Sequence, residues 1–321
     1  MSDRKSKSFV VAVLCTTVVA LGACGGSSAM SGGTGPGGTA LPSTTAPVVP
    51  TTAPGPSGPY WLVEDFTLAL LERNGLPVAT IAKIFNSPRT LLIVRPRGGA
   101  PDSLVPLATR VQSFASVTDM QTAIQSGAVE PGVRYLLYDN EAWSFTPDNE
   151  KQAPFTYAAQ AESLAHAHGY QLIFTPAANL APILSPAYTT SNRLGSGTDK
   201  YSGYLNLDMA GLGAARSDIF EIQGQQAEGS PDFASFVQQA TSQARAAAPG
   251  RPVLLGITTS IPGGGGVSAA TLSNVVAETR SVVDGYWLNV PQASAQCPVC
   301  GAADVGSAVS FLESYASGTG G

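Results

Sequence analysis

The chain has 321 residues and a formal net charge of −5 at pH 7, and beyond Arg4, Lys5 and Lys7 it shows no basic patch. The lack of a basic patch excludes a nucleic-acid-binding surface of the usual Lys/Arg type. Once the N-terminal segments described next are set aside, about 260 residues remain, too many for a small module and typical of one large α/β barrel.

Residues 1–23 have the pattern of an export signal. Arg4, Lys5 and Lys7 precede an apolar run from Phe9 to Leu21 that is too short to span a bilayer. The run leads into Leu-Gly-Ala-Cys, so the segment resembles a bacterial lipoprotein signal, which implies cleavage before Cys24 and a lipid such as palmitate on that residue. The protein is then expected outside the cytoplasm, anchored to the cell membrane. The alternatives are an ordinary cleaved signal peptide and an uncleaved anchor.

Residues 24–59 carry no charge and consist mostly of Gly, Ser, Thr, Pro and Ala. Such a composition cannot bury enough apolar area to offset the entropy of ordering, so we expect a disordered tether. A flexible tail is expected over residues 318–321. The folded domain is therefore expected over residues 60–317.

Within that domain, a helical segment is expected from Tyr60 to Phe85, with a break at Gly75-Leu76-Pro77. Strand-like runs then alternate with helical stretches. The alternation predicts parallel pairing, and the lack of a GxGxxG turn favours a (β/α)8 TIM barrel over an open doubly wound sheet. The eight expected strands are Thr90–Val94, Arg110–Ala115, Val133–Asp139, Tyr170–Thr175, Tyr204–Asp208, Ile219–Gln223, Val253–Thr258 and Asp284–Asn289.

The strand ending at Asp139 leads into two acids that share one face, Asp139 and Glu141. In a TIM barrel the carboxyl ends of the strands build the site. Neighbouring carboxylates repel, so one of them is expected to stay protonated, which suits a general acid. The alternative is a structural ion pair with Arg95 or Arg97 across the barrel mouth.

Polar side chains also follow the other expected strands. Glu221, Gln223 and Gln225 alternate along one strand and should point into the barrel, to serve a ligand or to form an internal hydrogen-bond network. Trp143 and Trp287 suit sugar rings, although tryptophan is equally common as packing under loops. Acids, amides and Trp favour a neutral polyhydroxylated ligand, and no cofactor is expected.

A metal site is not expected. His166 and His168 end the helix before a strand, on the face of the barrel opposite the site. Cys297 and Cys300 are expected to form a disulfide in an exported protein. A redox-active pair is the alternative, and zinc would need two further ligands.

Three blocks, YDNEAWSFTP, HAHGYQLIFTPAANL and DGYWLNVP, resemble TIM-barrel glycoside-hydrolase-like proteins secreted by actinobacteria, over about 230 residues from Thr90 to Tyr315. The resemblance implies a glycan ligand and a pair of carboxylates. On this basis Glu141 is the first choice for general acid, Asp139 adjusts its proton affinity, and either Asp208 or Glu221 is the second carboxylate. The expected substrate-binding residues are Trp143, Trp287, Asn289, Gln223, Gln225, Asn179 and Arg95.

The chain departs from the chitinase strand motif D-x-x-D-x-D-x-E. Only Asp139-Asn140-Glu141 matches its D-x-E ending. This departure leaves a second hypothesis open, a carbohydrate-binding or cell-envelope scaffold barrel that binds without cutting. A separation of about 5–10 Å between two of the candidate carboxylates across an open pocket would favour catalysis.

Overall fold

The structure is a computed structural model that describes residues 58–95, 102–261, 265–292 and 304–318. The expected signal peptide with Cys24, nearly all of the tether, Arg97 and the pair Cys297 and Cys300 lie outside these ranges. In the described ranges, no helix combines the length and apolar character needed to cross a membrane.

Eight parallel strands form a closed barrel and follow one another around the ring in chain order. Pairing of the first strand with both the second and the eighth closes the ring. This arrangement confirms the predicted TIM barrel. The strands are β1 (Tyr60–Glu64), β2 (Thr90–Ile93), β3 (Thr109–Phe114), β4 (Val133–Asn140), β5 (Gln171–Pro176), β6 (Ile219–Ile222), β7 (Val253–Thr258) and β8 (Gly285–Asn289).

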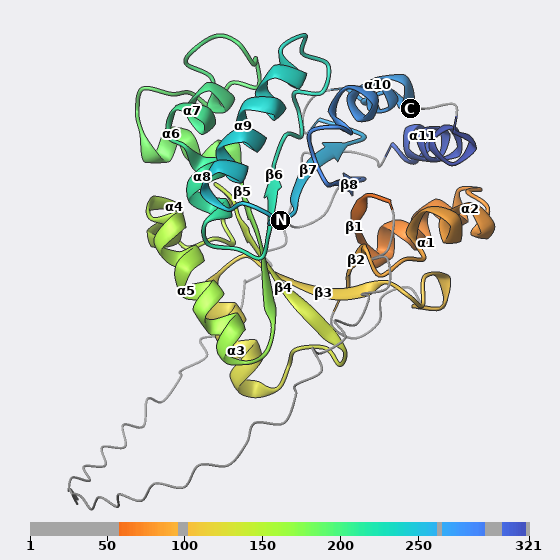
Figure 1. Cartoon of the computed structure of the whole chain (residues 1–321), viewed down its shortest axis with the longest axis horizontal. Coiled ribbons are helices and arrows are strands. Elements are labelled where there is room, and N and C mark those ends of the chain that lie inside the picture. The colour runs from red at the N-terminus through yellow and green to blue at the C-terminus, as the bar shows by residue number, and fades with distance from the viewer. Residues whose placement is uncertain (1–57, 96–101, 262–264, 293–303, 319–321) are drawn as a thin grey trace, which may run out of the picture. The chain divides into compact units, whose positions relative to one another are not determined.

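Helices follow the strands and lie outside the ring (Figure 1). Several are amphipathic; α9, for example, buries Phe233, Phe236 and Val237 against the strands and its neighbours. The α-helices are α1 (Asp65–Arg73), α2 (Val78–Phe85), α3 (Val117–Ser126), α4 (Asp148–Gln152), α5 (Pro154–Ala167), α6 (Ala181–Leu184), α7 (Lys200–Asn206), α8 (Met209–Ala214), α9 (Phe233–Ala247), α10 (Ala269–Thr279) and α11 (Val305–Ser317). Two 3-10 turns, η1 (Asp102–Leu104) and η2 (Ala178–Leu180), complete the described elements.

Two expected elements are wrong. Tyr60–Glu64 was expected to be helical and is the first strand, β1, with the break before Pro77 separating α1 from α2. The expected strand Tyr204–Asp208 does not form, because most of it lies in α7, whose N-cap Asp199 accepts hydrogen bonds from the backbone N–H groups of Tyr201 and Ser202. The missed strand and the false strand offset each other, so the expected total of eight was right for a partly wrong reason.

The barrel interior is apolar in its lower part. Alternate residues of the strands fill it, and the set is Leu62, Leu91, Ile93, Val111, Leu137, Ile173, Ile219, Leu254 and Trp287. The opposite faces of the strands pack on the helices; the indole of Trp61, for example, meets Phe85 of α2 edge-on, with ring centroids 5.5 Å apart. Because all strands are parallel, their carboxyl ends share one rim, where polar residues replace the apolar layer.

Closure of the ring depends on Gly285. This residue pairs with Tyr60 where β8 meets β1. A Cβ at this position would overlap the backbone of Tyr60, so only glycine allows the two strands to approach this closely.

Candidate active site

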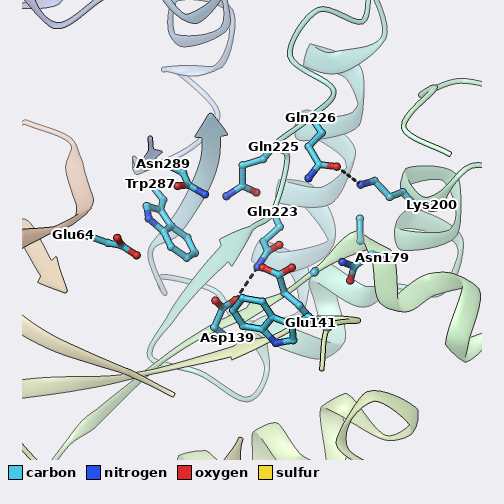
Figure 2. Close-up of a pocket in the computed structure, with 13 residues that line it drawn as sticks. Glu64, Asp139, Glu141, Asn179, Lys200, Gln223, Gln225, Gln226, Trp287 and Asn289 are labelled. Carbon is cyan, nitrogen blue, oxygen red and sulfur yellow. Dashed lines mark hydrogen bonds between the residues drawn. The ribbon is translucent and has the colours of Figure 1, made fainter. Parts of the chain in front are cut away.

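A pocket of about 180 Å³ lies at the carboxyl ends of the strands. It is smaller than the range of about 300–1,000 Å³ that is usual for drug-sized ligands, which suits a single ring or the end of a chain. Figure 2 shows its acids, amides and Trp287 arranged around one space. The lining residues are Glu64, Asp139, Glu141, Trp143, Ala177, Ala178, Asn179, Lys200, Gln223, Gln225, Gln226, Trp287 and Asn289.

The alternation of β4 directs its two acids into this pocket. Leu137 faces the barrel interior, and Asp139 and Glu141 share its side of the strand. On the outer side, Asn140 donates from Nδ2 to the hydroxyl of Tyr138 at 2.6 Å.

Tyr138 in turn donates to Oε2 of Glu150 at 2.6 Å, and Glu150 also accepts from the backbone N–H of Val117, at 3.0 Å, at the start of α3. This buried network ties the end of β4 to the start of α3 and to α4. It therefore fixes the position from which Asp139 and Glu141 project.

Asp139 is buried and holds two hydrogen bonds. Its Oδ1 accepts from Thr175 Oγ1 at 3.0 Å and from Gln223 Nε2 at 3.0 Å. Burial raises the pKa of Asp139 well above its ordinary range, and the charge of Glu141 raises it further, while the two hydrogen bonds act against the shift. The group is therefore neutral under conditions in which an exposed aspartate is ionised.

Glu141 directly follows β4 and keeps part of its surface exposed to the pocket. Burial of the rest of the side chain raises its pKa, whereas the amide of Asn179, the charge of Lys200 and the amide of Gln223 lower it. Asn179 also accepts from the backbone N–H of Ala142 at 2.9 Å, which holds the turn after Glu141. Because Asp139 and Glu141 interact, they titrate as a pair.

Glu64 is a third carboxyl group in the pocket. The sequence did not predict it, because the apolar run that contains it was expected to be helical. It ends β1, and its side chain is 32% exposed and pairs with Arg95 at 3.7 Å. Burial raises the pKa of Glu64 to about 7, even though a third of the side chain meets solvent, and the charge of Arg95 opposes the shift.

Arg95 was expected to bind substrate or to pair with the acids of β4. Its guanidinium lies 3.9 Å from the ring centroid of Phe66, and its backbone N–H donates to Asp65 at 3.2 Å. The side chain is 56% exposed and does not line the pocket. Its ion pair is with Glu64, and it contributes to the pocket through that carboxylate.

Lys200 also lines the pocket and was missed. It is the first residue of α7, its side chain is largely buried, and its Nζ donates to Oε1 of Gln226 at 2.9 Å. Burial lowers the pKa of Lys200 to about 8, while the charges of Glu141 and Glu228 raise it. No sequence pattern indicated that Lys200 lines a pocket, because the residues that follow it were expected to form the strand Tyr204–Asp208.

The two residues predicted as second carboxylate do not line the pocket. Asp208 is exposed at the N-cap of α8 with φ 51°, because the strand that was expected to present it does not exist. Glu221 points into the barrel one layer below Gln223 and is fully buried. Neither location exposes the carboxyl group to a ligand in the pocket.

The two predicted tryptophans both line the pocket and both have packing roles. Trp287 of β8 is 6% exposed and belongs to the apolar barrel interior. Trp143 donates from Nε1 to Thr146 at 2.7 Å and meets the ring of Phe145 edge-on at 5.5 Å. For both tryptophans, a surface for a sugar ring and a packing role are therefore compatible. The predicted amides Asn179, Gln223, Gln225 and Asn289 also line the pocket.

The histidines lie away from the pocket. His166 Nε2 lies 2.8 Å from Asp218, which also accepts from the backbone N–H of Leu172 at the start of β5. In the part of the chain that the structure describes, no three His, Cys, Asp or Glu side chains are grouped to hold a metal ion.

No protein-family model and no curated protein matches the chain. Among solved structures, a chitinase from Chromobacterium violaceum is similar at 11% identity and TM-score 0.44, over 82% of this chain and 99% of that one. A sugar phosphate isomerase/epimerase from Parabacteroides distasonis is similar at 11% identity and TM-score 0.44, over 83% and 97% of the two chains. A spore cortex-lytic enzyme from Bacillus megaterium is similar at 10% identity and TM-score 0.43, over 81% and 74%.

These similarities are too distant to carry an argument about activity. Barrels of this kind host many unrelated reactions. What the protein does has to be inferred from the pocket itself.

Proposed function

We propose that the protein is a glycoside hydrolase that acts on a glycan, with Glu141 as the general acid. The observation that carries this proposal is the grouping of Glu64, Asp139 and Glu141 around one small pocket with a Trp surface and several amides. A general acid must hold its proton near the working pH, and burial raises the pKa of Glu141 in that direction.

Glu64 is the second carboxylate in this proposal. It reaches the pocket from β1, whereas Glu141 follows β4, so the two groups approach a ligand from different sides (Figure 2). Burial raises the pKa of Glu64 to about 7 and the charge of Arg95 acts against that shift, so the ionised form that a base or nucleophile needs is the major form above about pH 7. Asp139 lies between them in a positioning role, because Thr175 and Gln223 already occupy one of its oxygens.

The chemical roles follow from this placement. Glu141 donates its proton to the glycosidic oxygen as the bond to the anomeric carbon breaks. Glu64 either removes a proton from an attacking water or attacks the anomeric carbon itself, depending on the separation of the two carboxyl groups. The amides of Gln223, Gln225 and Asn289 offer donors and acceptors to hydroxyl groups, and the indole of Trp287 offers an apolar face.

A hydrolysis screen on plant, fungal and bacterial glycans tests the proposal. Glu141→Gln and Glu64→Gln should each lower kcat by at least about a hundredfold, because each removes a group that transfers a proton or forms a bond. Glu72→Gln is the matched control, since Glu72 is an exposed glutamate on α1. Full activity in Glu141→Gln would remove Glu141 from the catalytic role.

The second candidate is a barrel that binds a glycan without cutting it. One observation favours it: Asp139 and Glu64 already have partners within the protein, in Thr175, Gln223 and Arg95. Under this candidate no glycan in the screen is hydrolysed, and Glu141→Gln binds the glycan ligand as the wild type does.

The location of the protein is part of the proposal. The N-terminal pattern supports an extracytoplasmic protein held on the cell membrane by a lipid on Cys24. Expressed in a bacterium, the full chain should partition into the detergent phase of a Triton X-114 extract, and Cys24→Ser should move it to the aqueous phase. A wild-type chain found in the aqueous phase would argue against the anchor.

A further inference from the structure

Lys200 is held in the pocket by contacts that the proposed reaction does not use. Asp199 caps α7 and places Lys200 at the first helical position. Lys200 is 7% exposed, and Figure 2 shows its amine directed at Gln226, on the side of the pocket away from Glu64. Its Nζ lies 2.9 Å from the Gln226 side-chain oxygen.

The loop that faces Lys200 is also held in a specific conformation. Gln226 has φ 80°, in the left-handed region that is unfavourable for a residue other than glycine. The hydroxyl of Tyr201 donates to the backbone oxygen of Gln225 at 2.6 Å, and the Tyr201 ring lies 5.0 Å from the Lys200 ammonium. Two elements, the start of α7 and the loop after β6, are thus fixed around one amine.

Within the described ranges, the charge of this amine has no ion-pair partner. Among the residues that the structure describes, no carboxylate forms an ion pair with Lys200; Glu141 and Glu228 act on it only at longer range. A buried ammonium is costly unless an anion accompanies it, and in the part of the chain that the structure describes Gln226 accepts from one of the three N–H donors of Lys200. A ligand that carries a negative charge would supply the missing partner.

We propose that Lys200 and Gln226 form a subsite for the carboxylate of an acidic sugar, so that the pocket takes a glycan containing a residue of the uronic-acid class. A carboxylate fits better than a phosphate, because among the described residues that line the pocket the only cation is Lys200, and no arginine fork is present to hold a dianion. The inference rests on the proposed function only in taking the ligand to be a glycan.

The test compares binding within pairs of free monosaccharides, which contain no glycosidic bond and so report binding without turnover. Calorimetry or ligand-observed NMR at pH 6 would measure glucuronic, galacturonic and mannuronic acids against glucose, galactose and mannose. At least one acid should bind about tenfold or more tightly than its neutral counterpart, and glucose 6-phosphate should bind more weakly than that acid. The preference should shrink as salt is raised.

Two variants test whether the Lys200 amine causes the preference for the acidic sugar. Lys200→Met should abolish it, so that each acid binds no more tightly than its neutral counterpart, and Lys200→Arg should keep most of it. Lys83→Met is the matched control, because Lys83 lies on α2 and donates to the backbone oxygen of Ala316 away from the pocket. Thermal unfolding of each variant would show that it is folded.

The outcomes separate this inference from the proposed function. A wild-type protein without any preference for an acid, a preference that survives Lys200→Met, or tighter binding of the sugar phosphate would overturn the uronate subsite. Hydrolysis of neutral glycans together with no acid preference would overturn the subsite alone. An acid preference without hydrolysis of any glycan would support the subsite and contradict the hydrolase.

Discussion

Replacement of Glu221 by Met should stabilise the protein at neutral pH. Glu221 is fully buried under the pocket, and among the described residues neither carboxylate oxygen has a partner that meets hydrogen-bond geometry. Burial raises its pKa well above the ordinary value, the charges of Asp139 and Glu141 add to the shift, and the backbone of Gly256 offsets only part of it.

The magnitude follows from these contacts. A buried polar group without a partner costs about 1–3 kcal/mol, and more when it is charged. Met has a similar length and no polar atom, so repacking should cost under about 1.5 kcal/mol. Once the repacking cost is subtracted, we expect the free energy of unfolding at pH 7 to rise by up to about 3 kcal/mol, and Tm to rise by about 2–4 °C for each kcal/mol.

The effect should depend on pH in a defined direction. The folded-state pKa of Glu221 lies above its unfolded value of 4.5, so below that pH both states are protonated and ionisation costs nothing. As pH rises from 4.5 through the folded-state pKa, the unfolded chain ionises first and the wild type loses stability. The advantage of Glu221→Met should therefore be small at pH 4.5 and larger at pH 7.

Urea unfolding of the two proteins at both pH values measures this difference. Glu150 provides the contrast, because it is equally buried but accepts from Tyr138 and the backbone of Val117. Glu150→Met should destabilise by about 1–3 kcal/mol for each donor left without a partner. A lower free energy of unfolding for Glu221→Met at pH 7, or the same change at both pH values, would contradict this prediction. Either result would mean that Glu221 has a partner that stabilises its charge.

Three further predictions concern the pocket and the C-terminal cysteines. The proposed roles need Glu64 ionised and Glu141 protonated, so kcat should rise as pH approaches the Glu64 pKa of about 7 and fall as pH exceeds the raised apparent pKa of the Glu141–Asp139 pair. Lys200→Met should move the fall to higher pH, because the Lys200 charge lowers the Glu141 pKa, and an unmoved fall would contradict that coupling. Gly256→Ala should lower the free energy of unfolding by about 1–3 kcal/mol in urea titrations, because the added Cβ would overlap Glu221 and Gln225. Wild-type stability in this variant would show that the two side chains move aside at little cost. Mass spectrometry of the exported protein should find Cys297 and Cys300 joined in a disulfide, and alkylation of both without a reductant would disprove it.

The sequence predicted the strand positions wherever an apolar run is bounded by clear turn signals. Val253–Thr258 is buried throughout and was expected with the same bounds that β7 has. Seven of the expected strands correspond to β2 to β8, with bounds that differ by at most one residue. The prediction failed for YWLVE, a run of five residues that continues into α1 without a turn, because a short apolar run shows no period that separates strand from helix.

The prediction of a strand at Tyr204–Asp208 was wrong for the opposite reason. Tyr204 is buried and Leu205 and Leu207 are partly buried, which a strand would also show, but Tyr204 lies between helices and meets the ring of Phe236 of α9 at 5.9 Å. Burial against another helix is a tertiary event that local composition does not distinguish from burial in a sheet. The Asp199 cap was the one local signal that favoured a helix.

Local sequence determined which side of β4 Asp139 and Glu141 occupy, because alternation along a strand is a property of the backbone. It equally determined that Gln223 and Trp287 point into the barrel. Only the tertiary structure decided which groups share the pocket with them. Glu64 and Lys200 reach the same pocket from opposite sides of the ring. No local sequence pattern encodes their proximity, because it depends on the closure of β1 onto β8 and on the path of the chain between β5 and β6.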